Sequence, residues 1–292
     1  MSTLTVASSR PVSGLRPALA GLVLLVFAAL TWAAPRPVAA AERGRIEAFL
    51  QVTGFDVALD SIAFSAGAAP KMLGIDPGAF GSEWSRLTRE VFDTAVMREL
   101  ALDILEPTLQ DDWLDHAATF YAGDLGQKLV AAENAAHMDE DDAAKKAEGA
   151  RLLAQLRDSD SPRVALLERM NAAIDGTDAS LRALQEIQFR FLMAASAAGV
   201  VQLRLDADAL RALLAEKSDE MRESIRASAL AGAAYTYRDF TDAEIEAYAA
   251  ALEAPEMRRV YELLSAVQYE VMANRFEALA QRMSGLRPGE DI

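Results

Sequence analysis

Apolar side chains recur at three- and four-residue steps through most of the chain beyond residue 43, which is the period of an α-helix that buries one face. No alternating β-branched run of strand length interrupts this pattern. The sequence therefore predicts an all-α fold. Residues 65–81 hold two prolines and four glycines and are expected to form the longest irregular stretch. The expected helices cover residues 44–60, 82–105, 111–122, 125–157, 163–175, 178–199, 206–232, 242–253 and 256–284.

A gap-free alignment of the chain with itself relates two stretches of this pattern. Residues 109–130 align with residues 240–261 at a constant offset of 131, and the residue classes repeat although identities are few. On a helical wheel, the apolar residues of each stretch fill one continuous arc, and acidic residues lie opposite. The alignment therefore predicts an internal repeat.

The signals that begin and end helices also coincide in the two stretches. Thr241 and Glu244 have the spacing of a capping box, and Gln110 holds the aligned position as a poorer cap. The break at Gly123-Asp124 aligns with Ala254-Pro255, and both pairs suit the start of a new helix. Each stretch is expected to form a helix, an abrupt turn and a longer helix.

The repeat predicts two tandem, related multi-helix units that pack into a helical array or bundle. The first unit is expected to span residues 42–158 and the second, a degenerate copy, residues 159–292. Cap chemistry and a proline place the joint between them at 158–162. The two units are expected to pack together, because small amphipathic units need a shared core.

Residues 1–41 have the order of a secretory signal peptide. Arg10 and Arg16 form a basic leading region, residues 18–34 carry no charge, and small residues follow. We expect cleavage after Ala40 or Ala41 and a periplasmic location. The alternative is an uncleaved leader that tethers the protein to the membrane, since the apolar run approaches the length that spans a bilayer.

The charge of the chain excludes some classes of partner. The net charge is −15, and loss of the leader, which has three arginines and no acidic residue, would make it −18. An acidic surface disfavours nucleic acid and anionic membranes, since both are bound through Lys and Arg. The chain has no cysteine, which removes disulfides, thiolate metal sites and thiol catalysis.

The helix break and the start of the next helix carry a family resemblance. The run FYAGDLGQKL at residues 120–129 resembles the signature of the family called domain of unknown function 2059 (DUF2059), and residues 46–56 resemble its opening helix and Thr-Gly turn. Gly123-Asp124 stands where the family has a Ser-Pro-like break. The resemblance covers residues 44–140 well and residues 163–284 loosely. It implies an exported bacterial helical protein and carries no catalytic residues over to this chain.

The two histidines beyond the leader give weak signals of chemistry. His116 lies at the edge of an apolar arc, and its aligned position in the second stretch is Ala247. A structural role is the favoured interpretation. His137 precedes the densest acidic run, residues 139–142, which lacks the EF-hand order of ligands. We interpret the run as a solvated helix face rather than a cation site, because consecutive helical acids point in different directions.

Paired carboxylates and tyrosines are the remaining candidates for functional residues. Acidic pairs lie on the polar faces of the aligned helices, where an exposed carboxyl lacks the shifted pKa of a general acid or base. These pairs are Asp111 with Asp115 and Asp242 with Glu246. Tyr248 and Tyr261 are interpreted as core residues. Tyr235 and Tyr237 flank a helix connection; ring packing under a loop is favoured, and lining of a cleft is the alternative.

The sequence favours a non-catalytic periplasmic binding or interaction protein with an unknown protein or small-molecule partner in the envelope. No nucleophile elbow, phosphate-binding loop or HExxH run is present. We therefore assign no catalytic, cofactor-binding or metal-binding residue, and we expect no stable membrane insertion after signal cleavage. The alternatives are an envelope enzyme with a carboxylate site at the interface of the two units, and a tethered envelope factor. Any function is expected where the copies differ or where they meet.

Overall fold

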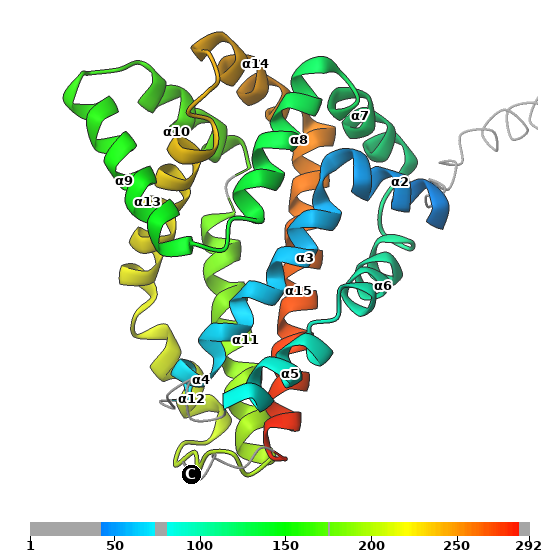
Figure 1. Cartoon of the computed structure of the whole chain (residues 1–292), viewed down its shortest axis with the longest axis vertical. Helices are drawn as coiled ribbons and strands as arrows, with labels where there is room; N and C mark the ends of the chain where they lie inside the picture. Colours follow the sequence, from blue (N-terminus) through cyan, green and yellow to red (C-terminus); the bar gives the residue numbers. More distant parts are fainter. Residues whose placement is uncertain (1–41, 74–80, 175, 286–292) are drawn as a thin grey trace, which may run out of the picture. The chain divides into compact units, whose positions relative to one another are not determined.

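The computed structural model describes residues 42–73, 81–174 and 176–285, and the predicted leader lies outside these ranges. The described residues are all-α, as the periodicity predicts. Figure 1 shows the order of the helices. Their bounds are α2 Arg43–Thr53, α3 Phe55–Ser65, the 3₁₀ turn η1 Ala66–Ala68, α4 Ala69–Met72, α5 Gly81–Val91, α6 Thr94–Leu105, α7 Asp111–Tyr121, α8 Asp124–His137, α9 Asp142–Asp158, α10 Arg163–Ala173, α11 Thr177–Ala197, α12 Ala207–Ala215, α13 Ser218–Thr236, α14 Asp242–Leu252 and α15 Pro255–Met283.

Several long helices predicted from the periodicity are broken in the structure. Gly54 ends α2 in the left-handed region at φ 71° and starts α3. Asp93 begins α6 by accepting a hydrogen bond from the backbone N–H of Val96, and Asp141 begins α9 by accepting one from Ala144. The expected single helices over 44–60, 82–105 and 125–157 were therefore wrong, because local caps interrupt a continuous apolar pattern. The expected helix over 206–232 is also two helices, α12 and α13.

The part predicted to be irregular is partly helical. Residues 66–72, inside the expected loop 65–81, form η1 and α4. Residues 74–80 of that loop lie outside the described ranges. Single glycines and prolines therefore interrupt helices here without preventing short ones.

The aligned stretches form helices with the same bounds. Adding the offset of 131 to α7 gives the bounds of α14, and adding it to the first residue of α8 gives the first residue of α15. The capping box of Thr241 and Glu244 is present, whereas Gln110 makes no side-chain cap. Helix pairings recur as well: α2 packs on α7 and α3 on α6 and α8, while α10 packs on α14 and α11 on α13 and α15. The division into tandem units stays a prediction that these correspondences favour.

The acidic pairs of the repeat bind arginines in both stretches. Arg45 of α2 forms ion pairs with Asp111 and Asp115 of α7. The aligned carboxylates of α14 bind arginines of α10 instead. These pairs are Arg163 with Asp242 at 2.7 Å and Arg169 with Glu246 at 3.9 Å. These carboxylates join one helix to the next, although partly exposed pairs of this kind stabilise a fold only modestly.

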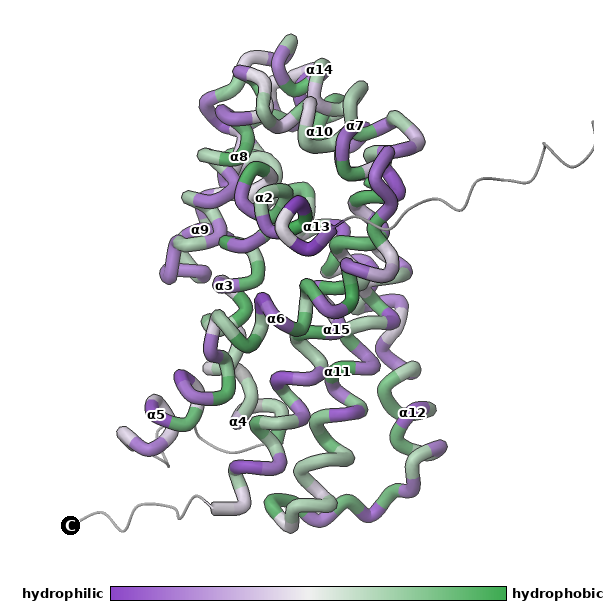
Figure 2. The backbone as a smooth tube through the Cα atoms, turned by 90° about the vertical axis from the view of Figure 1, so that its right-hand side faces the viewer, coloured by the Kyte–Doolittle hydropathy of each residue, from purple (hydrophilic) through white to green (hydrophobic). Residues whose placement is uncertain are grey.

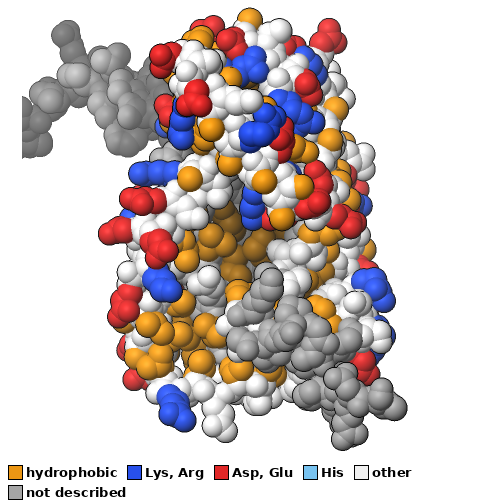
Figure 3. Space-filling model, turned by 60° about the vertical axis from the view of Figure 1, so that its left-hand side comes forward, with side chains coloured by type: hydrophobic (Ala, Val, Ile, Leu, Met, Phe, Trp, Pro, Cys, Tyr) orange, Lys and Arg blue, Asp and Glu red, His pale blue; other side chains and the backbone are white. Residues whose placement is uncertain are grey.

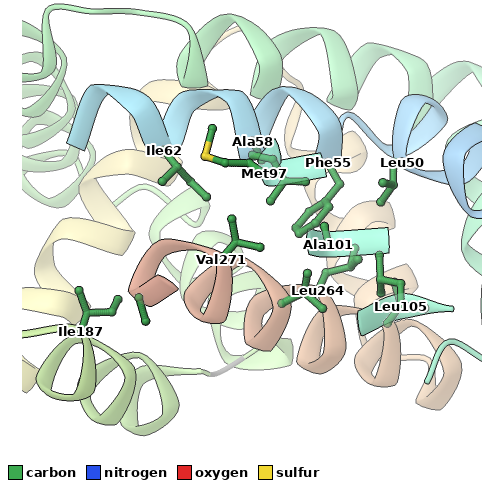
Figure 4. Packing of buried hydrophobic residues seen from close by; sticks show 14 of the residues in the cluster. Leu50, Phe55, Ala58, Ile62, Met97, Ala101, Leu105, Ile187, Leu264 and Val271 are labelled. Carbon is green, nitrogen blue, oxygen red and sulfur yellow. The ribbon is translucent and has the colours of Figure 1, made fainter. Parts of the chain in front are cut away.

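Helix α15 lies at the centre of the packing. It contacts α3, α5, α6, α7, α11 and α14, and all described residues belong to one compact unit (Figure 1). Its apolar stripe is buried in a core to which helices from both predicted units contribute. Figure 4 shows Leu264 and Val271 of α15 among side chains such as Met97, Ala101 and Ile187. The last helix thus packs on helices of both predicted units.

No described helix is long and apolar enough to cross a membrane. Figure 2 shows hydrophilic and hydrophobic residues mixed along α11 and α15, the two longest helices of the described chain. This mixing is what helices with one buried and one solvated face require.

Two helices meet at a glycine. A Cβ added to Gly149 of α9 would lie 2.4 Å from the carbonyl oxygen of Ala231 in α13. A backbone atom cannot rotate away as a side-chain tip can. The close approach of α9 and α13 therefore requires glycine at this position.

Gly149→Ala is expected to lower the free energy of unfolding, whereas Gly232→Ala raises it. The overpacking cost of about 1–3 kcal/mol at position 149 exceeds the roughly 0.5–1 kcal/mol that alanine gains over glycine inside a helix. Gly232, on α13, has no atom within 4 Å of an added Cβ and serves as the control. Urea unfolding of both variants measures the difference. A stabilised Gly149→Ala variant would contradict the packing described.

Candidate functional site

Four tyrosine hydroxyls and one carboxyl form a hydrogen-bonded cluster. Tyr121 ends α7, Glu133 lies on α8, Tyr237 follows α13, Tyr248 lies on α14 and Tyr261 on α15. Tyr121 and Tyr248 are almost completely buried, and the other three keep part of their surface. The cluster forms where α7 and α8 meet α14 and α15, the helices that the repeat relates.

The hydrogen bonds of this cluster form a connected network. Tyr237 and Tyr248 donate to Oε1 of Glu133 at 2.6 and 3.0 Å. The hydroxyl of Tyr261 lies 2.7 Å from that of Tyr248. The hydroxyl of Tyr121 lies 3.1 Å from that of Tyr248 and also hydrogen-bonds Tyr261.

One arrangement of protons satisfies every hydroxyl in the network. Because Tyr237 and Tyr248 give their protons to Glu133, Tyr248 accepts from the other tyrosines, for example with Tyr261 donating to Tyr248 and Tyr121 donating to Tyr261. Each donor then has one acceptor, which a buried polar group requires. Both bonds to Glu133 end on Oε1, and no described residue donates to Oε2. That oxygen remains available to a further donor.

Burial controls the ionisation of the cluster. Removal from water raises the pKa of Glu133, and the bonds from Tyr237 and Tyr248 offset this only in part. Burial, together with the nearby Glu133 carboxylate, also raises the pKa of the Tyr237 and Tyr248 hydroxyls. The tyrosines therefore stay protonated donors at neutral pH, and Glu133 holds a proton more tightly than an exposed glutamate.

The turn between α7 and α8 fixes the relation of Tyr121 to Glu133. A Cβ on Gly126 would lie 2.4 Å from the carbonyl oxygen of Phe120, so only glycine allows so close a return of the chain. Gln127 donates to the carbonyl oxygen of Tyr121 at 2.6 Å. The GDLGQKL run thus encodes the tight turn that places both site residues on one side of the bundle.

Glu133 faces a cleft of about 660 Å³ formed by α8, α9, α10, α13, α14 and α15. Its walls are rich in small residues, including Ala150, Ala231 and Gly232, and Tyr237, Tyr248 and Tyr261 also line it. A smaller cavity of about 140 Å³ adjoins it and shares Glu133 and Tyr261. The space-filling view in Figure 3 shows a recess with hydrophobic side chains in its wall. The volume lies within the usual range for small-molecule sites, about 300–1,000 Å³.

The candidates from the sequence lie in different places. His116 is exposed on α7, outside the cleft, and His137 lies at the rim of both cavities. In the acidic run, Asp139 accepts a hydrogen bond from Tyr235 at 3.0 Å, and Asp142 pairs with Lys146 at 2.5 Å. Within the described ranges, no group of three or more His, Cys, Asp or Glu residues is placed to hold a metal ion.

The two pairs of tyrosines that the sequence singled out have different outcomes in the structure. Tyr235 and Tyr237 both line the cleft, which was the less favoured alternative. Tyr248 is buried in the core, and Tyr261 packs against it, as predicted. The sequence did not indicate that their hydroxyls meet.

Glu133 was missed in the sequence. It follows Gly126, Leu129 and Val130, the buried residues of α8, at helical spacing. A carboxyl at the next position of a buried stripe was a signal that could have identified it.

Replacing the carboxyl should change how stability depends on pH. The folded protein binds the Glu133 proton more tightly than the unfolded chain, whose ordinary pKa is 4.5. This tighter binding of the proton stabilises the folded wild-type protein at low pH. The stabilisation is lost as the pH rises above 4.5 through the pKa that Glu133 has in the folded protein. Glu133→Gln lacks the titration, so its stability relative to wild type should increase from pH 4 to pH 8. Urea midpoints measure this, with exposed Glu223→Gln as control. A constant difference across the range would contradict the burial described.

The comparisons with known proteins concern the segment that carries Tyr121 and Glu133. No curated protein and no solved structure matches the chain. One family matches, described as "Uncharacterized protein conserved in bacteria (DUF2059)", over residues 95–155, which include α7 and α8. The match does not extend to the second stretch of the repeat. Residues 95–155 thus match the DUF2059 family model, as the resemblance of the GDLGQKL run and its flanking helices predicts.

Proposed function

We propose that this protein is a non-catalytic periplasmic binding protein that holds a small molecule in the cleft at Glu133. The observation that carries the proposal is a Glu133 carboxyl that lines the cleft, accepts hydrogen bonds from Tyr237 and Tyr248 on one oxygen, and is linked through Tyr248 to two further tyrosines. Binding sites for small molecules are usually mostly apolar clefts that contain a small number of precisely placed polar groups.

The free oxygen of Glu133 selects the chemistry of the ligand. The tyrosines already occupy Oε1, so a ligand reaches the carboxyl through Oε2 as a hydrogen-bond donor. A carboxylate accepts and cannot donate, whereas a carboxylic acid group on the ligand would compete with it for protons. Ligands with an amine or hydroxyl group are therefore favoured over acids.

Charge favours an amine over a hydroxyl. A buried carboxylate is costly unless a cation accompanies it, and the groups that hydrogen-bond Glu133 are neutral tyrosines. The two lysines in the cleft wall have other partners: Lys145 donates to the carbonyl oxygen of Ala136 at 2.9 Å, and Lys146 forms an ion pair with Asp142 at 2.5 Å. A protonated amine with an apolar body would neutralise Glu133 and fill the alanine-lined space.

A second candidate function is an envelope enzyme that uses Glu133 as a general acid or base. It is favoured by the raised pKa of a carboxyl at the meeting point of the two aligned helix pairs. The two functions differ in what Glu133→Gln removes. A binding protein loses affinity for amines and has no turnover to lose, whereas an enzyme loses turnover and keeps much of its substrate binding.

Binding of a matched six-carbon series tests the proposed ligand class. Hexylammonium is expected to bind more tightly than hexanol, and hexanoate most weakly. Glu133→Gln should weaken hexylammonium at least tenfold, a change of about 1.4 kcal/mol, and leave hexanol within twofold. Isothermal titration calorimetry measures each affinity, with Glu223→Gln as the charge-matched control. Equal affinities across the series, or an unchanged Glu133→Gln variant, would overturn the proposal.

The periplasmic location is a separate part of the proposal and rests on the pattern of the leader. We expect the protein purified from a bacterial envelope fraction to begin at Ala41 or Glu42. Mass spectrometry of the intact protein measures its first residue. A mass that includes residues 1–40 would favour the tethered envelope factor instead.

A further inference from the structure

A second pocket has Tyr261 in its wall, as the Glu133 cleft does. It has a volume of about 370 Å³ and is formed by α11, α15 and the end of α10. Tyr261 and Ile174 line both hollows. Glu133 does not line the second pocket, so its chemistry must come from other residues.

The walls of this pocket are apolar and its polar floor is satisfied. Ala173, Ala183, Ile187 and Ala273 are among its lining residues. The hydroxyl of Tyr269 donates to Oγ of Ser180 at 2.7 Å, so these two groups already have partners. The interior therefore offers an apolar surface to whatever enters.

The carboxylates at the edge of the pocket already form ion pairs. Each binds an arginine that does not line the pocket. The pairs are Glu186 with Arg211 at 2.8 Å, Glu262 with Arg259 at 2.7 Å and Glu270 with Arg190 at 2.9 Å.

Two arginines at the same edge have no such partner. Arg182 of α11 and Arg258 of α15 are exposed, and no described carboxylate lies within ion-pair distance of either. Asp178 forms its ion pair with Arg222 at 2.8 Å and Glu253 with Arg169 at 2.7 Å, so Arg182 and Arg258 act on these two carboxylates only at longer range. The guanidinium groups of Arg182 and Arg258 therefore make no direct ion pair with a described carboxylate at the edge of the pocket.

We propose that this pocket binds an amphiphile with one anionic headgroup, whose carboxylate lies between Arg182 and Arg258 and whose hydrocarbon tail packs on the alanine and isoleucine wall. Guanidinium groups bind carboxylates through directed hydrogen bonds. Burial of the tail supplies the apolar part of the affinity. The inference goes beyond the amine site at Glu133, because it concerns a different pocket and the opposite headgroup charge.

A ten-carbon series tests this pocket by titration calorimetry. Decanoate, below its aggregation concentration, is expected to bind more tightly than decanol and decyltrimethylammonium. Arg182→Gln/Arg258→Gln should weaken decanoate at least tenfold and leave decanol within twofold. The charge-matched control is Arg89→Gln/Arg157→Gln, two exposed arginines outside the pocket, which should leave decanoate within twofold.

Two further variants keep the proposal falsifiable. Ala183→Leu, which adds bulk to the pocket wall, should weaken decanoate and decanol alike, and Glu133→Gln should change neither. Circular dichroism melts establish that each variant is folded. Decanoate affinity that is unchanged in Arg182→Gln/Arg258→Gln, or lowered as much by the control pair, would overturn the proposal. Failure of the hexylammonium test alone would leave it standing, since the two pockets are measured with different probes.

Discussion

Glu133 imposes the strongest constraint on this structure, because a carboxyl taken out of water must be hydrogen-bonded by the protein. Its own helix cannot supply the donors, since the backbone N–H groups of α8 are used within the helix. The donors come from Tyr237 and Tyr248, which belong to the end of α13 and to α14. These elements must therefore surround α8, and the cleft forms between them. Burial of the apolar stripe of α15 packs this helix against α14 and against helices of the first predicted unit such as α6 and α7.

The aligned stretches form helices with matching bounds, and the residues of the site lie at positions that the two stretches do not share. At the offset of 131, Glu133 aligns with Leu264, and Tyr248 aligns with Ala117. Leu264 and Ala117 are both buried apolar residues. The ion pairs of the acidic positions, by contrast, are conserved in kind between α7 and α14. Positions that the two stretches share thus hold helices together. The network forms where one stretch has Glu133 or Tyr248 and the other has a buried apolar residue.

The sequence predicted the helical class and the capping box of Thr241, because these depend on local periodicity and on short-range hydrogen bonds. It failed at Gly54 and Asp141, where one residue ends or begins a helix inside an uninterrupted apolar pattern. The sequence did not predict the ion pairs of the acidic residues, because the arginines that bind them lie far away along the chain. Glu133 was within reach of sequence reasoning, since it lies on the buried stripe of α8. Its tyrosine partners were not, because no local pattern tells which hydroxyls converge in space.

The pKa of Glu133 tests the central claim most directly. The side-chain carboxyl carbons of glutamate can be labelled with ¹³C and followed by NMR as pH is changed, and Glu133→Gln identifies the Glu133 signal by its loss. A carboxyl buried among tyrosine rings should titrate above 4.5, the ordinary value for glutamate. Titration at or below 4.5 would show that the carboxyl is solvated, and would contradict both the network and the cleft built on it.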